Sequence, residues 1–109
     1  MSTQDKKNLL ELARVVRSKN SGPYELVLDV IFKDRATFEA VRRTGQFSAE
    51  RVAGVYGLPT AAIHNIVWFE PAYAVKVVLR REIVSGAPGD SDVYGAQQHA
   101  PLLALDFAL

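Results

Sequence analysis

The chain has 109 residues, 49% hydrophobic and 23% charged, a length and composition typical of one soluble globular domain covering residues 1–109. Its 13 Lys and Arg residues against 12 Asp and Glu residues give a formal net charge of +1, which argues against the broad basic surface of a nucleic-acid-binding or membrane-binding protein. The absence of Cys excludes disulfides, thiolate metal sites and cysteine nucleophiles.

The N-terminus predicts neither export nor membrane insertion. Residues 1–7 are polar, and Glu11 and Arg14 interrupt the apolar stretch that follows, so the hydrophobic region of a signal peptide is missing. The longest wholly apolar runs span only a few residues, such as Ile66–Phe69, whereas a membrane-spanning helix needs roughly 20. We therefore expect a cytoplasmic protein that does not contact membranes.

The first third of the chain contains one ambiguous segment, one loop and one strand. From Asn8 to Val16 the apolar residues fit both helical and strand spacing, and the local pattern slightly favours a helix. Arg17–Pro23 is composed of residues that favour turns, which predicts a loop. Tyr24–Phe32 alternates apolar and polar residues, which predicts a half-buried strand.

Two helices are predicted next. Asp34 is placed to cap a helix that runs from Arg35 to about Thr44, and Gly45 is placed to end it. Ser48 is placed to cap a second helix, with Gly57 as its stop. The connector at residues 59–62 is short enough for a single helical turn.

The second half of the chain predicts two more strands and a loop. Ile63–Glu70 and Tyr73–Ile83 are rich in β-branched and aromatic residues, and Pro71 between them fits a tight connection. Ser85–Asp92 is the most loop-like stretch. The apolar end of the tail, Leu102–Leu109, forms either a helix or a final strand.

These elements predict an α+β fold. No repeat or charge run divides the sequence, so the elements share one core. The economical arrangement is a two-layer sandwich in which helices cover one face of a mainly antiparallel four-stranded sheet and leave the other face to solvent or another subunit. The residues expected in the core are Leu26, Leu28, Val30, Phe32, Phe38, Val41, Val52, Val75, Val77 and Leu79.

Two segments are candidates for chemistry. Arg17, Ser18, Lys19 and Asn20 offer donors that suit a carboxylate or a phosphate, although a polar connector needs the same residue types. Glu70 follows two aromatic residues, where burial could raise its pKa toward a general-acid role; the alternative is an exposed Glu at a strand end.

No metal or cofactor is predicted. His64 and His99 lie far apart, and neither has a second His or Cys at ligand spacing. Neither a Walker loop nor a dinucleotide-binding glycine motif occurs.

Three segments resemble the bacterial family known as domain of unknown function 4387, and the resemblance covers essentially the whole chain. These segments are Leu12–Pro23 (LARVVRSKNSGP), Ile66–Ala72 (IVWFEPA) and Asp90–Leu103 (DSDVYGAQQHAPLL). The family brings no established reaction with it.

The chain also resembles, more remotely, the C-terminal ferredoxin-like domain of acyclic terpene utilisation (AtuA-like) proteins. Arg17, Ser18 and Gly22 match that domain's Arg-Ser-Gly-Asp-Lys-Gly loop, Phe47–Val52 is similar to its Leu-Thr-x-Glu-Arg-Val helix start, and Asp92–Gly95 is similar to its Asp-x-x-Gly tail. Two motif lysines are replaced here, by Ser21 in the loop and by Ala96 in the tail.

This second resemblance changes the expected fold in one place. It implies a strand over Leu10–Val16 in place of the helix, a hairpin closed by the Arg17 loop, and a strand-strand-helix-strand-strand-helix order in a ferredoxin-like sandwich. In the AtuA-like proteins the domain is fused to a larger N-terminal body, so a separately encoded large subunit is the implied partner.

The resemblance also leads to the main functional hypothesis. The chain is expected to be a small subunit or accessory domain, in a homo- or hetero-oligomer, that docks on an AtuA-like large protein and helps form a site for a carboxylate or acyl-CoA-type substrate in catabolism. One alternative is a stand-alone homo-oligomeric hydratase, lyase or isomerase with Arg17, Glu70 and His99 meeting at subunit boundaries. Another is a non-catalytic interaction module.

Because the loop and the tail both carry matched motifs, we expect them to lie together. The expected ligand-binding patch combines Arg17, Ser18, Lys19 and Asn20 with Asp92, Tyr94 and Gln97, and adds His99 and Glu70 as catalytic candidates. His99 is the tail group with an ordinary pKa near neutrality. The alternative is a structural ion pair in which Asp92 ties the tail to Arg17.

Overall fold

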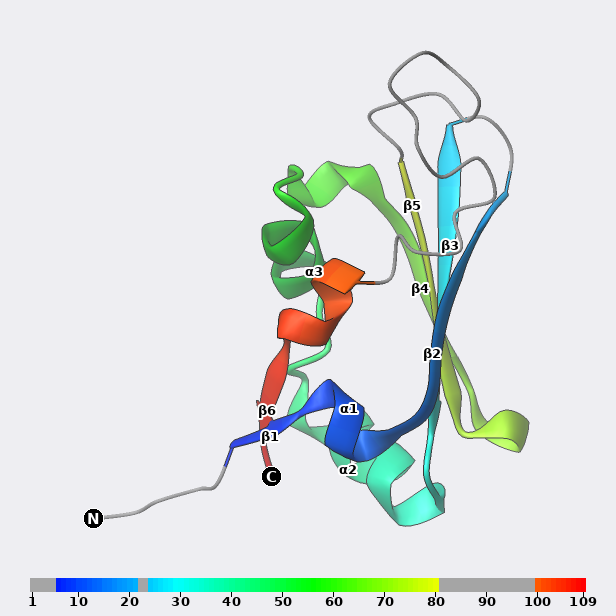
Figure 1. The fold of residues 1–109 in the computed structure, drawn as a ribbon, viewed down its shortest axis with the longest axis vertical. Helices are drawn as coiled ribbons and strands as arrows, with labels where there is room; N and C mark the ends of the chain where they lie inside the picture. Colours follow the sequence, from blue (N-terminus) through cyan, green and yellow to red (C-terminus); the bar gives the residue numbers. More distant parts are fainter. Residues whose placement is uncertain (1–5, 22–23, 81–99) are drawn as a thin grey trace.

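An antiparallel sheet forms one layer of the protein. The computed structural model describes residues 6–21, 24–80 and 100–109. Four strands lie side by side in the order β2 (Ala13–Asn20), β3 (Glu25–Phe32), β5 (Ala74–Arg80) and β4 (Ile63–Phe69), and each neighbouring pair is antiparallel. The strands β2 and β4 are therefore the edges of this sheet (Figure 1).

Helices cover one face of the sheet. The helical elements are α1 (Leu9–Leu12), α2 (Arg35–Thr44), α3 (Ala49–Tyr56) and the 3-10 turns η1 (Thr60–Ala62), η2 (Glu70–Ala72) and η3 (Ala100–Ala104). Figure 1 shows α1, α2, α3 and η3 on the same side of the sheet, and no described α-helix lies on the other side. This arrangement confirms the predicted α+β two-layer sandwich and is consistent with its ferredoxin-like form. None of the described helices is long and apolar enough to cross a membrane.

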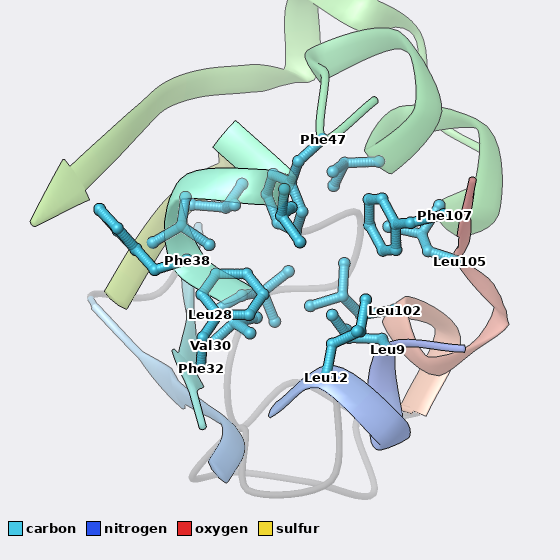
Figure 2. Packing of buried hydrophobic residues seen from close by; sticks show 14 of the residues in the cluster. Leu9, Leu12, Leu28, Val30, Phe32, Phe38, Phe47, Leu102, Leu105 and Phe107 are labelled. Atoms are coloured by element: carbon cyan, nitrogen blue, oxygen red, sulfur yellow. The ribbon is translucent and has the colours of Figure 1, made fainter. Parts of the chain in front are cut away.

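A single hydrophobic cluster fills the space between the two layers. It contains Leu9, Leu12, Leu26, Leu28, Val30, Phe32, Phe38, Val41, Phe47, Val52, Val75, Val77, Leu79, Leu102, Leu105 and Phe107. Every residue predicted for the core belongs to it. Figure 2 shows that the two ends of the chain also contribute, because Leu9 and Phe107 lie in the same cluster as Leu28 and Phe38.

The two longer helices have the predicted ends. The Asp34 side chain accepts a 2.8 Å hydrogen bond from the Thr37 backbone N–H, and Ser48 caps α3 in the same way. Gly45 and Gly57 end the two helices with positive φ angles of 70° and 65°, a conformation that costs glycine little. Local chemistry therefore sets both ends of each helix.

Acidification is expected to weaken the N-terminus of α2. The hydrogen bonds from Thr37 lower the pKa of Asp34 below its ordinary value of 3.8. A carboxyl with a lowered folded-state pKa contributes stability that is present above the unfolded pKa and lost as the pH falls through the folded pKa. The wild type should therefore lose stability relative to Asp34→Asn as the pH falls below 3.8. Urea unfolding of both proteins across this pH range measures the difference in their free energies of unfolding. A difference that does not change with pH would contradict the prediction.

The N-terminal segment combines both structures weighed for it. The strand expected over Leu10–Val16 begins only at Ala13, and residues Leu9–Leu12 form the single turn α1. The Asn8 side chain caps this turn by accepting a 3.0 Å hydrogen bond from the Leu10 backbone N–H. The strand prediction is therefore wrong for its first three residues, because one helical turn directs Leu9 and Leu12 into the core.

The two ends of the described chain form a separate antiparallel pair, which we call the terminal ribbon: β1 (Lys6–Asn8) and β6 (Asp106–Ala108). The Gln46 side-chain amide donates to the Ala108 carbonyl and accepts from its N–H, both at 2.9 Å. The Arg51 guanidinium donates to the Asp106 carbonyl at 2.6 Å. The apolar tail thus ends as a strand, one of the two forms expected for it.

Candidate binding site

The predicted loop at Arg17–Pro23 is wrong for its first four residues. Arg17 to Asn20 continue strand β2 and pair with Leu26 to Asp29 of β3. The ladder pairs backbone groups of residues that, by composition alone, favour a turn. Pairing between distant segments therefore overrides the local preference.

The strand also separates the four residues of the candidate anion site. Consecutive strand residues point to opposite faces. Ser18 and Asn20 pair with core residues of β3 and lie on the helix-covered face, where Ser18 is only 8% exposed. Arg17 and Lys19 lie on the opposite face. The structure therefore divides the four predicted residues into two pairs, with the two cations on the face opposite the helices.

The tail half of the predicted patch lies outside the described residues. Asp92, Tyr94, Gln97 and His99 all fall in the range 81–99, so their proximity to Arg17 and the proposed tie through Asp92 stay predictions. The structure does show another carboxylate beside Arg17. The Arg17 Nε lies 3.4 Å from the Asp29 Oδ2 across the β2–β3 pair.

Glu70 lacks the burial that a general-acid role would need. It begins the turn η2 between β4 and β5, next to Pro71, and its side chain is exposed. The physical reason for naming Glu70 a catalytic candidate is therefore absent from the structure.

The face of the sheet opposite the helices carries a shallow hollow of about 350 Å³. We call it the sheet-face hollow. Its lining residues are Arg17, Asp29, Ile31, Val67, Phe69, Ala72, Ala74 and Lys76. They come from all four strands and from η2, so the paired sheet itself forms the site.

The strand register divides this lining into two adjacent rows. Arg17 lies opposite Asp29, Asp29 opposite Lys76, and Lys76 opposite Val67, which makes a row of three charges that ends in an apolar side chain. The second row lies two positions further along each strand. In it, Ile31 lies opposite Ala74, and Ala74 lies opposite Phe69. Directly opposed residues share one face of a sheet. The hollow therefore has a charged side and an apolar side.

The charged row has an excess of one positive charge. Among the described residues that line the hollow, Asp29 carries the only carboxylate; its side chain is 14% exposed and contacts Arg17. Lys76 is exposed, and it forms no ion pair with another residue of the described chain. An anion that enters the hollow therefore meets a lysine that no described carboxylate holds in an ion pair, with Asp29 as its neighbour on β3.

Outside the hollow, the described residues contain little that suggests catalysis or metal binding. The His64 Nδ1 lies 3.0 Å from the Glu25 Oε2, and both side chains are 41% exposed. No group of three or more metal-ligating side chains occurs in the part of the chain that the structure describes.

Burial raises the pKa of the Tyr56 phenol, which also makes a hydrogen bond with the Leu102 backbone. Tyr56 therefore stays protonated and joins α3 to η3.

Sequence reasoning missed most of the hollow. Lys76 stands out from the sequence as a charge on the polar side of its strand, and Asp29 does the same on β3. That signal identifies the face to which each residue belongs. It does not identify the neighbours, because the pairing of β3 with β5 and of β5 with β4 is needed to place Asp29 and Val67 on either side of Lys76.

Comparison with known proteins gives one match. Residues 9–106 match the family described as Domain of unknown function (DUF4387). No curated protein and no solved structure matches the chain. The match covers the helical layer and the four-stranded sheet, and it ends at Asp106, the first residue of β6.

Proposed function

We propose that this chain, which belongs to the DUF4387 family, is a small accessory subunit. It docks on a larger cytoplasmic protein of the AtuA-like type and helps form a site for a carboxylate or acyl-CoA-type substrate in catabolism. One structural observation carries the proposal: the sheet face on which no described helix lies exposes the large apolar side chains of Val67 and Phe69. The resemblance to a domain that is elsewhere fused to a larger body supports the choice of partner.

The apolar part of this face is continuous. Phe69 is 55% exposed and Val67 42% exposed, and the half-buried Ile31 lies in the same row as Phe69. Contiguous exposed apolar side chains with polar neighbours are typical of interaction surfaces. A partner that covers this face would remove them from water and would also close the open side of the sheet-face hollow.

The polar groups of the described residues favour binding over catalysis by the chain alone. A general acid or base needs a tuned pKa and a position beside the reacting atoms. Glu70 is exposed, and His64 contacts Glu25 at the surface. A larger partner that supplies the catalytic groups fits this arrangement better than a stand-alone hydratase, lyase or isomerase.

The proposal is tested by affinity capture from the native host with the neighbouring genes intact. The tagged chain should retain an AtuA-like large protein that lacks its own C-terminal ferredoxin-like domain, in a fixed stoichiometry measured by mass spectrometry. The double variant Val67→Ser/Phe69→Ser should lower the recovery of that protein about tenfold or more, because it removes apolar contacts at the centre of the face.

The matched control is Leu10→Ser/Tyr24→Ser, which changes two side chains that are 62% and 61% exposed but do not line the hollow. This control should recover as much large protein as the wild type. Capture of no AtuA-like protein, or equal loss in both double variants, would overturn the proposal. Turnover of an acyl-CoA or unsaturated acid by the purified chain would support the stand-alone enzyme instead.

A further inference from the structure

We propose that the sheet-face hollow is a binding site for a small apolar monocarboxylate. In this site the Lys76 ammonium holds the carboxylate, and Ile31, Ala74 and Phe69 contact the apolar part of the ligand. The inference rests on the proposed function, because it specifies which class of ligand binds at the same face of the sheet. It can be tested on the chain by itself.

The apolar side of the hollow owes its shape to a small residue between two large ones. Ala74 lies opposite both Ile31 and Phe69 on neighbouring strands. Its methyl group leaves the space that a larger side chain on β5 would fill. A hollow of about 350 Å³ lies at the small end of the range for ligand pockets, roughly 300–1,000 Å³. A short carbon chain fits this space, and a cofactor-sized molecule does not.

The spacing of the two rows sets the length of the ligand. Residues two apart on a strand are separated by about 7 Å. Lys76 and Ala74 have this relation on β5. A ligand with its charged group at Lys76 therefore needs an apolar body of a few carbons to reach the row of Ile31, Ala74 and Phe69.

The charges select a single negative group. Among the described lining residues, the carboxylate of Asp29, which Arg17 contacts at 3.4 Å, offsets only one of the two cations Arg17 and Lys76. One anion at Lys76 makes the hollow neutral. A second negative charge on the ligand would face Asp29 without a further cation, and a cationic ligand would meet the positive excess. A neutral ligand would gain only the apolar contacts.

A titration followed by NMR tests the ligand class directly. The ¹⁵N-labelled chain is titrated with sodium hexanoate, hexanol and hexylammonium chloride at equal concentrations and constant ionic strength. Hexanoate should shift the amide signals of β5 and β4 around Lys76, Ala74 and Phe69. Hexanol should bind more weakly at the same signals, and hexylammonium more weakly still.

Two isosteric or near-isosteric variants should move the hexanoate affinity in opposite directions. Lys76→Gln removes the cation and should weaken binding about fivefold, the size of an exposed ion pair. Asp29→Asn removes the competing carboxylate and should strengthen binding by a similar factor. Arg80→Gln is the control, since it removes a cation from the same face of β5 at a position that does not line the hollow, and it should leave the affinity near that of the wild type.

A steric variant tests the position of the apolar part. Ala74→Val keeps a residue that favours strands but fills the space between Ile31 and Phe69. Hexanoate binding should be lost while the urea midpoint of the chain stays near that of the wild type. If the midpoint falls instead, the Lys76→Gln and Asp29→Asn pair still decides the question, because neither change alters the packing.

Shifts at the same signals for hexanol and hexanoate with equal affinity would overturn the inference, as would equal affinities for Lys76→Gln and Asp29→Asn. Failure here is distinguishable from failure of the proposed function. The titration uses the chain alone, so a missing hexanoate site leaves the capture of the large protein unaffected, and a missing large protein leaves the titration unaffected.

Discussion

Replacing Phe38 by Ala is expected to lower the free energy of unfolding by about 3–5 kcal/mol. The side chain is 0% exposed. Its ring centroid lies 6.2 Å from that of Phe32 and 5.7 Å from that of Trp68, both in edge-to-face geometry. Phe38 therefore joins α2 to both β3 and β4, and truncation would leave a cavity between the two layers. Equilibrium unfolding in urea measures the loss.

Phe69→Ala is the matched control for this prediction. It removes the same ring from the opposite face of the sheet, where Phe69 is 55% exposed, so we expect a change within about 0.5 kcal/mol. The contrast depends on burial and not on the chemistry of the side chain. Equal destabilisation by the two substitutions would show that Phe38 does not occupy the centre of the core.

Phe107→Ala is expected to destabilise the protein by a similar amount, about 3–5 kcal/mol. Phe107 is 0% exposed, and its ring stacks on that of Phe47 with a centroid separation of 6.2 Å. Arg51 on α3 adds a cation–π contact, because its guanidinium carbon lies 5.2 Å from the centroid of the Phe107 ring. Phe107 is thus the residue through which β6 becomes part of the main core.

The test of this second prediction compares Phe107→Ala with Leu10→Ala in thermal and urea unfolding. Leu10 is 62% exposed, so its truncation should change the stability by no more than about 0.5 kcal/mol. If Phe107→Ala is equally mild, β6 is not part of the cooperatively folded unit. If Phe107→Ala instead gives two separate transitions, the terminal ribbon unfolds before the sheet.

The parts of the fold that the sequence predicts well are those with local determinants. Asp34 and Ser48 satisfy backbone donors within the next turn of their own helices, and Gly45 and Gly57 adopt the backbone conformation that ends them. The strand Glu25–Phe32 follows from alternation within eight residues. In each case the physical cause lies within a few residues of the structure that it produces.

The parts that the sequence does not predict depend on distant partners. Arg17–Asn20 has the composition of a turn and becomes strand because β3 supplies its hydrogen bonds. Nothing near Lys6 indicates that it will pair with Ala108. The sheet-face hollow has the same origin, since Lys76 acquires its neighbours only through the strand order. The cluster predicted from sequence neighbours, Arg17–Asn20, is therefore divided between the two faces of the sheet. The sheet-face hollow instead combines residues from separate strands.

The terminal ribbon has a consequence for the order of folding during synthesis. Leu9 and Leu12 near its first strand share a core with Leu102, Leu105 and Phe107, and the Leu9 backbone N–H donates to the Leu105 carbonyl. Contacts between such distant segments carry a large loop-closure cost and lower the folding rate. A ribosome-bound chain that ends before residue 102 can pair its hairpins and form α2 and α3, but the apolar surface of α1 stays in water. The core closes only after the last strand has left the exit tunnel.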